Sequence, residues 1–189
     1  MVTFQDKQIF IDGKPIFILS GEMHYFRQPK ENWQHLIDEA KAMGLNCISS
    51  YVPWILHEET EGEYCFEDNL DLGAFIDLCK ENGLHFFVRP GPYIMAEMKK
   101  GYLAECRKWY QKVMQVIVPR LQCKGGNIIG VQLDNEIGML NWVTNYPTLT
   151  DHVLRMFVEY LSSMYTEEEL NVRYNFWDKT EQEVFAALR

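Results

Sequence analysis

The chain alternates short apolar runs with longer segments in which apolar residues recur every three or four positions. The apolar runs begin near residues 16, 45, 84 and 127, which gives a repeat of about 37 residues. A short apolar run is typical of a buried strand, and the three-to-four spacing is typical of a helix with one buried face. Strands joined by crossovers of this length lie parallel, so the pattern predicts an α/β fold with helices packed on a parallel sheet.

The N-terminus departs from this pattern and predicts a β-hairpin. Residues 4–11 (FQDKQIFI) alternate roughly as a strand does, and residues 15–19 (PIFIL) form a second apolar run. Asp12 and Gly13 lie between them, and an Asp-Gly pair between two strands is a strong signal for a tight turn. The second strand is expected to continue through residues 20–25.

Three helices are predicted between the apolar runs. The first begins near Glu31 and ends at Gly44, and the second begins at a cap supplied by Asp68 or Asn69 and ends at Gly83. The third ends before a Gly-Gly pair. The apolar faces consist of Trp33, Leu36, Ile37, Ala40 and Met43 in the first helix, Leu72, Phe75, Ile76 and Cys79 in the second, and Leu103, Cys106, Tyr110, Val113, Met114, Ile117 and Leu121 in the third.

The C-terminal part of the chain predicts helices and no further strand. Thr166 with Glu169, and Thr180 with Glu183, fit the capping box, in which a hydroxyl and a carboxylate bind free N–H groups at a helix start. An earlier helix is expected to present one apolar face, formed by Val153, Phe157, Tyr160, Leu161 and Met164.

Length limits how much of a known architecture the chain can hold. A complete eight-fold (β/α) barrel takes about 250 residues, and eight repeats of the length seen here would need about 300. The chain has 189 residues, so it holds four strand–helix units and a helical tail. Its 47% of hydrophobic residues is enough for a core and excludes disorder as the state of the whole chain.

The net charge, the cysteines and the N-terminus indicate which partners, which thiol state and which location to expect. The net charge of −9 disfavours binding to nucleic acid or to an anionic membrane. The five cysteines are widely spaced and include no CxxC pair, so reduced thiols are expected rather than disulfides or a zinc site. The N-terminus lacks a secretion-signal pattern and no apolar run reaches the length of a membrane span, so a cytoplasmic location is expected.

Polar side chains gather where the four predicted strands end. Because the loops after parallel barrel strands converge on one rim, these side chains predict a site there. They are Glu22, His24, Tyr25 and Arg27 after the first strand, Tyr51, Trp54, His57 and Glu58 after the second, Arg89, Tyr93 and Glu97 after the third, and Asp134, Asn135 and Glu136 after the fourth.

Most of these residues also have an interpretation without a direct role in function. His24 could equally contact substrate or form a hydrogen bond inside the barrel. Arg89 is expected to hold the rim carboxylates rather than to touch substrate. His57 and His85 are expected to be structural, because the sequence has no HxH or HExxH spacing and predicts no metal site. Glu136 is the exception, since a charged residue directly after an apolar strand is costly unless it has a function.

Four motifs, one at the end of each strand, resemble the family 35 β-galactosidases, which are retaining glycoside hydrolases on a (β/α)8 barrel. They are SGEMHYFR (20–27), YVPW (51–54), RPGPYIMAE (89–97) and VQLDNEIG (131–138). The tail at residues 165–184 is more similar to the family 42 β-galactosidases. The resemblance therefore implies a (β/α)8 barrel of the TIM type, of which only the first four to five βα units are present.

The same resemblance implies roles for individual residues. Glu136 matches the general acid/base, and Asn135 matches the residue that binds the sugar near its 2-hydroxyl. The resemblance implies no cofactor and no metal. The positions that line the sugar pocket are matched by Tyr51, Ile94, Ala96 and Glu97. From their places on the same rim, His24, Arg89 and Tyr93 are expected to support that pocket from behind.

The resemblance also identifies what the chain lacks. A retaining hydrolase needs a second carboxylate about 5–5.5 Å from the first, and in these families it follows the seventh strand. No residue of this sequence matches that nucleophile. Two loops typical of these families, after residues 96–101 and near residues 172–177, are also missing. The expected organisation is an N-terminal strand over 1–15, βα units 1–3 with the fourth strand over 16–138, and a helical tail over 139–189.

The leading hypothesis is therefore the incomplete catalytic domain of a retaining hydrolase that cleaves terminal β-galactosides or related small glycans. The isolated chain is expected to be inactive or incomplete as an enzyme. One alternative is a half-barrel that binds carbohydrate without catalysis. Another is a half-barrel that assembles with a second copy or with a complementing barrel half, because it would expose two strand edges and an apolar interior.

Overall fold

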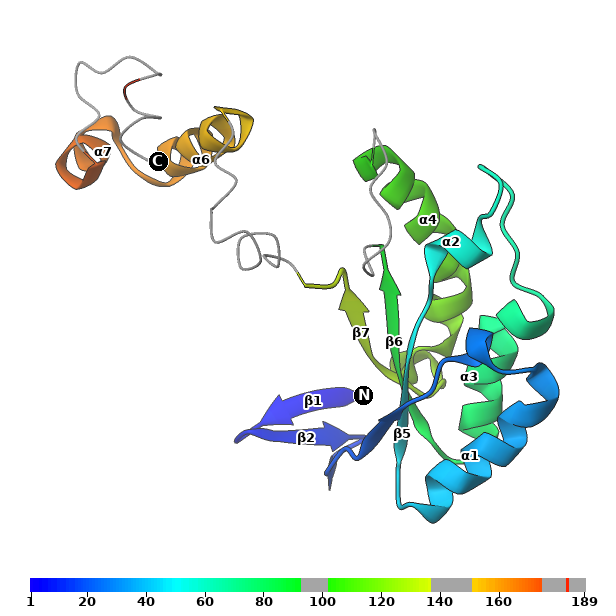
Figure 1. Cartoon of the computed structure of the whole chain (residues 1–189). Helices are drawn as coiled ribbons and strands as arrows, with labels where there is room; N and C mark the ends of the chain where they lie inside the picture. The colour runs from blue at the N-terminus through cyan, green and yellow to red at the C-terminus, as the bar shows by residue number, and fades with distance from the viewer. Residues whose placement is uncertain (93–101, 137–150, 175–182, 184–189) are drawn as a thin grey trace. The chain divides into compact units, whose positions relative to one another are not determined.

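The computed structural model contains a three-stranded antiparallel sheet followed by a four-stranded parallel sheet (Figure 1). It describes residues 1–92, 102–136, 151–174 and 183. The chain divides into two compact units, residues 1–136 and residues 137–189.

The described strands and helices follow the order that the hydrophobic pattern predicts. The strands are β1 (Val2–Gln5), β2 (Gln8–Ile11), β3 (Lys14–Ile16), β4 (Ser20–Glu22), β5 (Cys47–Tyr51), β6 (His85–Gly91) and β7 (Ile128–Leu133). The α-helices are α1 (Trp33–Ala42), α2 (Trp54–His57), α3 (Leu72–Glu81), α4 (Tyr102–Ile117), α6 (Asp151–Met164) and α7 (Glu167–Tyr174).

The N-terminal sheet has the strand order β1-β2-β3 and is antiparallel throughout. The predicted turn at Asp12 and Gly13 is confirmed, and both residues have positive φ. The prediction of one strand over residues 4–11 is wrong, because Asp6 and Lys7 also have positive φ, at 49° and 63°, and form a second tight turn. Such turns usually contain Gly or Asn, so an Asp-Lys pair gave little local signal.

The parallel sheet has the order β4-β5-β6-β7, which is also the order along the chain. Glu22 of β4 lies opposite Ser49 of β5, and Tyr51 of β5 lies opposite Arg89 of β6. The expectation that one strand runs from residue 15 to residue 25 is wrong, because β3 and β4 belong to different sheets. The carboxyl ends of all four parallel strands meet at one edge, as in a partial (β/α) barrel.

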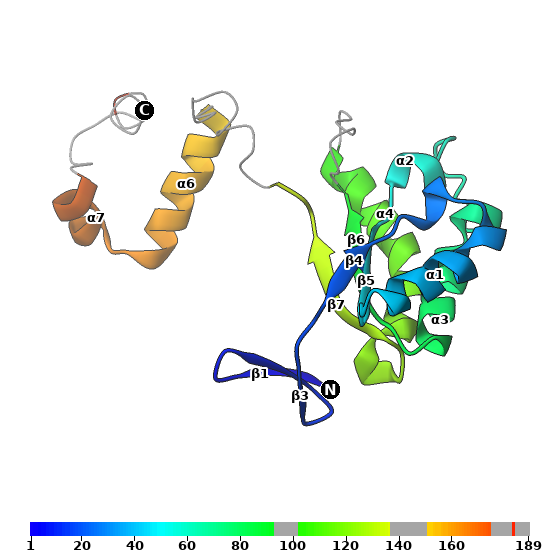
Figure 2. The same ribbon diagram turned by 60° about the horizontal axis from the view of Figure 1, so that its bottom comes forward.

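Helices α1, α3 and α4 cover one face of the parallel sheet (Figure 2). Their buried faces and the sheet residues beneath them form one core within residues 1–136. The largest members are Trp33 and Ile37 of α1, Leu72, Phe75 and Ile76 of α3, Trp109 and Ile117 of α4, and Ile48, Phe86 and Ile128 of the sheet. On the other face, an open hollow of about 350 Å³ is lined by Ile18, Ser20, Glu22, Cys47, Ser49, Phe87, Arg89 and Gln132.

The predicted helix ends are confirmed at Gly44 and Gly83, whose φ angles are 85° and 74°. The predicted cap of the second helix is wrong. Asp71 caps α3 by accepting a hydrogen bond of 2.8 Å from the backbone N–H of Ala74, because a 3-10 turn over Asp68–Leu70 precedes the helix. Met43 is 73% exposed rather than on the buried face, since it lies just beyond the end of α1.

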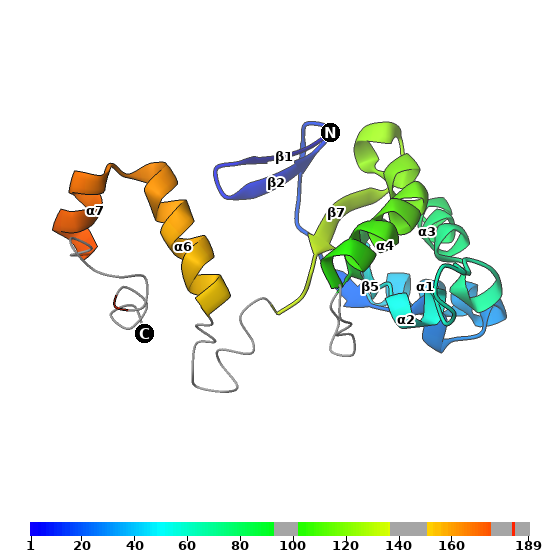
Figure 3. The same cartoon turned by 90° about the horizontal axis from the view of Figure 1, so that it is seen from above.

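Residues 137–189 contribute α6 and α7 (Figure 3). The capping box between Thr166 and Glu169 is confirmed, with reciprocal hydrogen bonds of 2.9 and 3.3 Å to the two backbone N–H groups. The pair of Thr180 and Glu183 is not tested, because residue 180 lies outside the described residues.

None of the described helices is long and apolar enough to cross a membrane. The predicted helix is confirmed as α6, and of its expected apolar face Leu161 is buried whereas Val153, Phe157, Tyr160 and Met164 are exposed.

Candidate active site at the carboxyl ends of the strands

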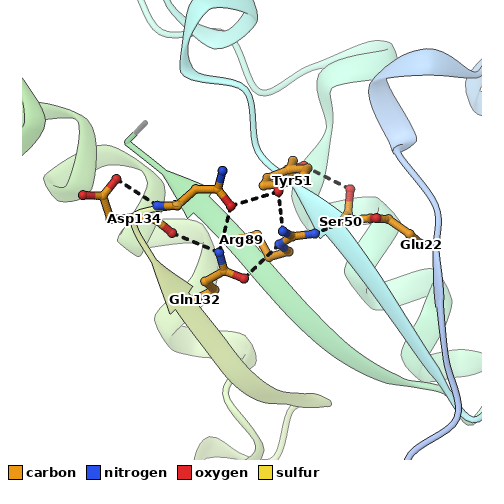
Figure 4. Close-up of polar contacts among 7 residues, drawn as sticks. Glu22, Ser50, Tyr51, Arg89, Gln132 and Asp134 are labelled. Atoms are coloured by element: carbon orange, nitrogen blue, oxygen red, sulfur yellow. Dashed lines mark hydrogen bonds and ion pairs between the residues drawn. The ribbon is translucent and has the colours of Figure 1, made fainter. Parts of the chain in front are cut away.

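The parallel sheet brings together residues that lie far apart in the sequence. Glu22 ends β4, Tyr51 ends β5, Arg89 lies near the end of β6, and Gln132 lies near the end of β7. Asn135, which follows β7 by two residues, forms hydrogen bonds with Tyr51 and Gln132, two of the residues labelled in Figure 4. The strand order therefore builds one polar cluster in which hydrogen-bonded side chains are up to 84 positions apart in the sequence.

Arg89 is the centre of this cluster. Its guanidinium lies 3.7 Å from the centroid of the Tyr51 ring, and it donates hydrogen bonds to the Tyr51 hydroxyl and to the Glu22 carboxylate. Its Nε donates a third bond of 3.1 Å to Oε1 of Gln132. The contact with Glu22 fits the interpretation in which Arg89 holds a rim carboxylate. A charge-assisted network of this kind keeps the strand ends in fixed positions.

The Asn135 side chain is largely buried, with 8% exposure. Its Oδ1 accepts hydrogen bonds from the Tyr51 hydroxyl at 3.0 Å and from Nε2 of Gln132 at 3.1 Å. Gln132 Nε2 also donates to the backbone carbonyl of Asp134 at 3.1 Å. Sequence reasoning missed Gln132. The available signal was a polar residue within the otherwise apolar strand β7.

The backbone after β7 is bent into a conformation that side chains rarely adopt. Asp134 and Glu136 have φ angles of 61° and 52°, each of which costs about 1 kcal/mol or more outside glycine. The Asp134 carboxylate accepts a hydrogen bond of 2.9 Å from the backbone N–H of Asn135, which stabilises the bend. The bend leaves Asn135 buried in the cluster and Glu136 exposed to solvent.

Helix α4 holds the neighbouring end of β6 in place. The Tyr110 hydroxyl donates to the carbonyl of Gly91 at 2.7 Å, and Trp109 Nε1 donates to the carbonyl of Pro90 at 2.8 Å. The backbone N–H of Asp134 donates to the same Gly91 carbonyl. These bonds join the ends of β6 and β7, so the cluster rests on a packed helix as well as on the sheet.

His24 lies beside the Tyr51 ring, with 5.7 Å between ring centroids. Its Nδ1 is buried and has no hydrogen-bond partner among the described residues. Burial lowers the pKa of His24, the Glu22 carboxylate opposes this shift, and two nearby arginines add to it. The imidazole is therefore neutral at neutral pH and supports Tyr51 from the side.

Several residues that the sequence predicts at the rim are not among the described members of the Arg89 cluster. Tyr93, Ile94, Ala96 and Glu97 lie outside the described residues, so their expected part in the pocket stays a prediction. Glu58 is engaged by the loop after α2, where it accepts hydrogen bonds from Trp54 Nε1 and from the backbone N–H of Gly62. His57 is fully buried in the core. The described residues contain no group of three or more His, Cys, Asp or Glu that could hold a metal ion.

The sequence matches one protein family over almost its whole length. The model of the family described as "Glycosyl hydrolases family 35" matches residues 8–104 and 98–187. The second matched segment contains the tail at residues 165–184. The expected likeness of the tail to family 42 is therefore not supported, because short helical motifs of charged and aromatic residues do not distinguish the two families.

Curated proteins give the same result. The human "Beta-galactosidase-1-like protein 2" is 36% identical over 69% of this chain, and a β-galactosidase of Felis catus is 38% identical over 72%. A "Beta-1,2-glucosyltransferase" of Ignavibacterium album is 32% identical over 90% of the chain. The matched regions cover 24%, 24% and 29% of these three relatives, so the chain spans about a quarter of their length.

Solved structures show the same fold. A β-galactosidase from the psychrophilic Marinomonas ef1 superposes with a TM-score of 0.60 at 19% identity, covering 88% of this chain and 29% of that one. A β-galactosidase from the haloarchaeon Halorubrum lacusprofundi gives a TM-score of 0.61 at 17% identity, covering 85% and 27%.

Proposed function

Since the chain belongs to glycosyl hydrolase family 35, we propose that it supplies the acid/base part of a retaining β-galactosidase-type active site. The observation that carries this proposal is the position of Asn135 and Glu136 directly after β7, at the edge shared with Tyr51 and Arg89. Asn135 is fixed in the polar cluster, whereas Glu136 is exposed and available to a ligand.

In the proposed reaction, Glu136 is the general acid that protonates the leaving glycosidic oxygen. A second carboxylate forms a covalent glycosyl intermediate through an oxocarbenium-like transition state. Glu136 then acts as general base and removes a proton from the water that hydrolyses the intermediate. Asn135 binds the sugar near its 2-hydroxyl. The second carboxylate is expected from a part of the barrel outside these 189 residues.

A chimera with a full-length relative tests this assignment. The chain replaces the matching quarter of the Felis catus β-galactosidase, and hydrolysis of an aryl β-galactoside is measured. We expect turnover, and we expect Glu136→Gln to lower kcat at least 100-fold, because general acid–base groups contribute about 10²–10⁴-fold. Glu81→Gln, at an exposed position at the end of α3, makes the same chemical change and is expected to leave kcat unaltered.

Two results would contradict the assignment. One is a chimera whose turnover survives Glu136→Gln. The other is turnover by the isolated chain that depends on Glu136, which would show that the chain contains its own nucleophile. A folded chimera that binds galactose in calorimetry but never turns over would instead favour a non-catalytic carbohydrate-binding role.

A second candidate activity is glycosyl transfer, because one relative covering 90% of the chain is named as a glucosyltransferase. Transfer and hydrolysis differ in the acceptor, which is a sugar hydroxyl in the first and water in the second. Analysis of the chimera's products in the presence of added disaccharide distinguishes them. A longer oligosaccharide as the main product would favour transfer.

A further inference from the structure

The hydrogen bonds around Arg89 have a fixed direction. A guanidinium carries only donors, so each group that it binds must present an acceptor. Its Nε donates to Oε1 of Gln132 at 3.1 Å, and its terminal nitrogens donate to the Glu22 carboxylate and to the Tyr51 hydroxyl (Figure 4). The Arg89 side chain is 19% exposed, so water competes little for its bonds to Gln132 and Tyr51.

The acceptor that Arg89 requires also fixes the orientation of the Gln132 side-chain amide. Because Oε1 of Gln132 accepts from Arg89, its Nε2 must face the other way, and there it donates to Oδ1 of Asn135 at 3.1 Å. The same Nε2 donates to the backbone carbonyl of Asp134 at 3.1 Å. Turning the Gln132 amide over would place an NH2 group against the guanidinium and an oxygen against a carbonyl, so only one orientation satisfies all three neighbours.

Two chains of hydrogen bonds, or arms, lead from Arg89 to Oδ1 of Asn135: the first passes through Gln132 and the second through Tyr51. The Tyr51 hydroxyl accepts from Arg89, so its single proton is free for Oδ1 of Asn135, which lies 3.0 Å away. Both arms thus begin at Arg89 and end as donors to Oδ1. With two donors at its oxygen, the Asn135 amide is held with Nδ2 directed away from Gln132 and Tyr51.

We propose that Gln132 and Arg89 are positioning residues that fix the orientation of the Asn135 amide, so that its NH2 group is presented as a donor to a hydroxyl oxygen of the bound sugar. The role of Asn135 as a sugar contact rests on the proposed function. The orientation of its amide does not, and it can be measured without sugar.

Two substitutions at Gln132 separate positioning from a purely structural role. Gln132→Glu keeps the acceptor for Arg89 and adds charge to that bond, but it removes the donor to Asn135. The introduced carboxylate instead attracts the Asn135 NH2 group and reverses the amide. Gln132→Met keeps the length of the side chain and removes both bonds, while the Tyr51 arm still holds Oδ1.

These changes predict opposite rankings of the two variants in stability and in sugar affinity. Thermal stability is expected to be lower in Gln132→Met, which leaves the Arg89 Nε without its acceptor, than in Gln132→Glu, which keeps that acceptor but turns a carboxylate oxygen toward the Asp134 carbonyl. Galactose affinity, measured by calorimetry, is expected to fall about tenfold or more in Gln132→Glu and by less in Gln132→Met. A purely structural role would move the two quantities together.

Nuclear magnetic resonance of the isolated chain tests the orientation directly. The side-chain NH2 signals of Asn135 are identified by their loss in Asn135→Asp. In Gln132→Glu both the proton shifts and the exchange with water are expected to change, because one proton then bonds to a carboxylate. Gln115→Glu, on the exposed side of α4, makes the same substitution away from the cluster and is expected to leave these signals unchanged.

Unchanged Asn135 signals in a folded Gln132→Glu chain would overturn the inference. So would a galactose affinity that follows stability across both variants. If the chain binds no galactose but the Asn135 signals respond as expected, the positioning role stands and the role of Asn135 in sugar binding is refuted.

Discussion

At the scale of single residues, His57 shows how burial controls charge. The imidazole is fully buried. Its Nε2 lies 2.5 Å from the hydroxyl of Tyr25, and its Nδ1 lies 2.6 Å from the carbonyl of Cys65. Burial lowers the pKa of His57 to about 4, and the bond to Cys65 opposes this shift only in part. The ring is therefore a neutral group that joins two loops through the core.

The lowered pKa of His57 makes the free energy of unfolding depend on pH. Between about pH 6.5 and 4 the unfolded chain binds a proton at His57 and the folded chain does not, so stability falls as the pH falls through this range. The pKa values of His24 and His85 are lowered in the same direction. We expect a loss of roughly 3 kcal/mol from His57 between pH 7 and pH 4, measured by urea unfolding at several pH values.

Variants identify the source of this pH dependence. His57→Asn is expected to be less stable at pH 7, because it loses the Tyr25 contact, and to show a weaker dependence on pH. The control His35→Asn replaces an imidazole whose side chain is 73% exposed on α1. If His57→Asn kept the full slope of the original chain, His57 would not be its source.

The sequence singles out a residue only where that residue carries the signal by itself. Glu136 is singled out because a charge directly after an apolar strand is unusual, and its role as the acid/base stays a prediction. Gln132 was missed, because its importance comes from Arg89 and Asn135, and a lone glutamine in a strand has no distinctive pattern. The same holds for Asp71, whose role as a helix cap depends on where the preceding 3-10 turn ends.

At the scale of elements, the connection between α4 and β7 depends on close backbone contact. It runs through two 3-10 turns, Val118–Arg120 and Gln122–Lys124. The backbone N–H of Gly126 donates to the carbonyl of Leu121 at 3.0 Å. A Cβ at Gly126 would lie 1.9 Å from the carbonyl oxygen of Arg120, so only glycine fits there.

Gly126→Ala is therefore expected to destabilise the chain by about 1–3 kcal/mol, because backbone atoms must move to relieve the overlap. The measurement is thermal unfolding followed by circular dichroism. Gly21→Ala is the matched control. Its new Cβ would overlap mainly the Cδ1 atom of Leu45, at 2.4 Å, which is the end of a flexible side chain and can turn away. Equal losses in the two variants would show that the contact with Arg120 is not the cause.

Elements defined by local patterns were predicted well. The starts of β5, β6 and β7 to within about two residues, and the glycine ends of α1 and α3, follow from apolar runs and C-terminal glycines. The turn at Asp6 and Lys7 was not predicted, because Lys7 does not favour positive φ and the pairing of β1 with β2 imposes it.

At the scale of the whole molecule, the main core lies entirely within residues 1–136. Within these residues, α1, α3 and α4 pack against β4–β7. The packing of α6 and α7 leaves several large apolar side chains exposed, including Phe157 at 41% and Tyr160 at 57%.

We expect a chain truncated after residue 136 to fold. Its helix signal and cooperative thermal unfolding should persist, with a midpoint within a few degrees of the full chain, because the truncation keeps every described member of the core that α1, α3 and α4 form with the sheet. Circular dichroism and calorimetry check this. A truncated chain without a cooperative transition would show that the tail stabilises the sheet unit.

The sequence by itself determined the alternation of strands and helices, the hairpin turn at Asp12 and Gly13, and the edge of the sheet at which polar residues gather. These features depend on neighbours a few positions apart. Tertiary structure alone decided which polar residues meet. Arg89 and Gln132 are 43 positions apart, and Tyr51 and Asn135 are 84 positions apart. Only the strand order brings them within hydrogen-bond distance, and only their donors and acceptors then decide how Asn135 is oriented.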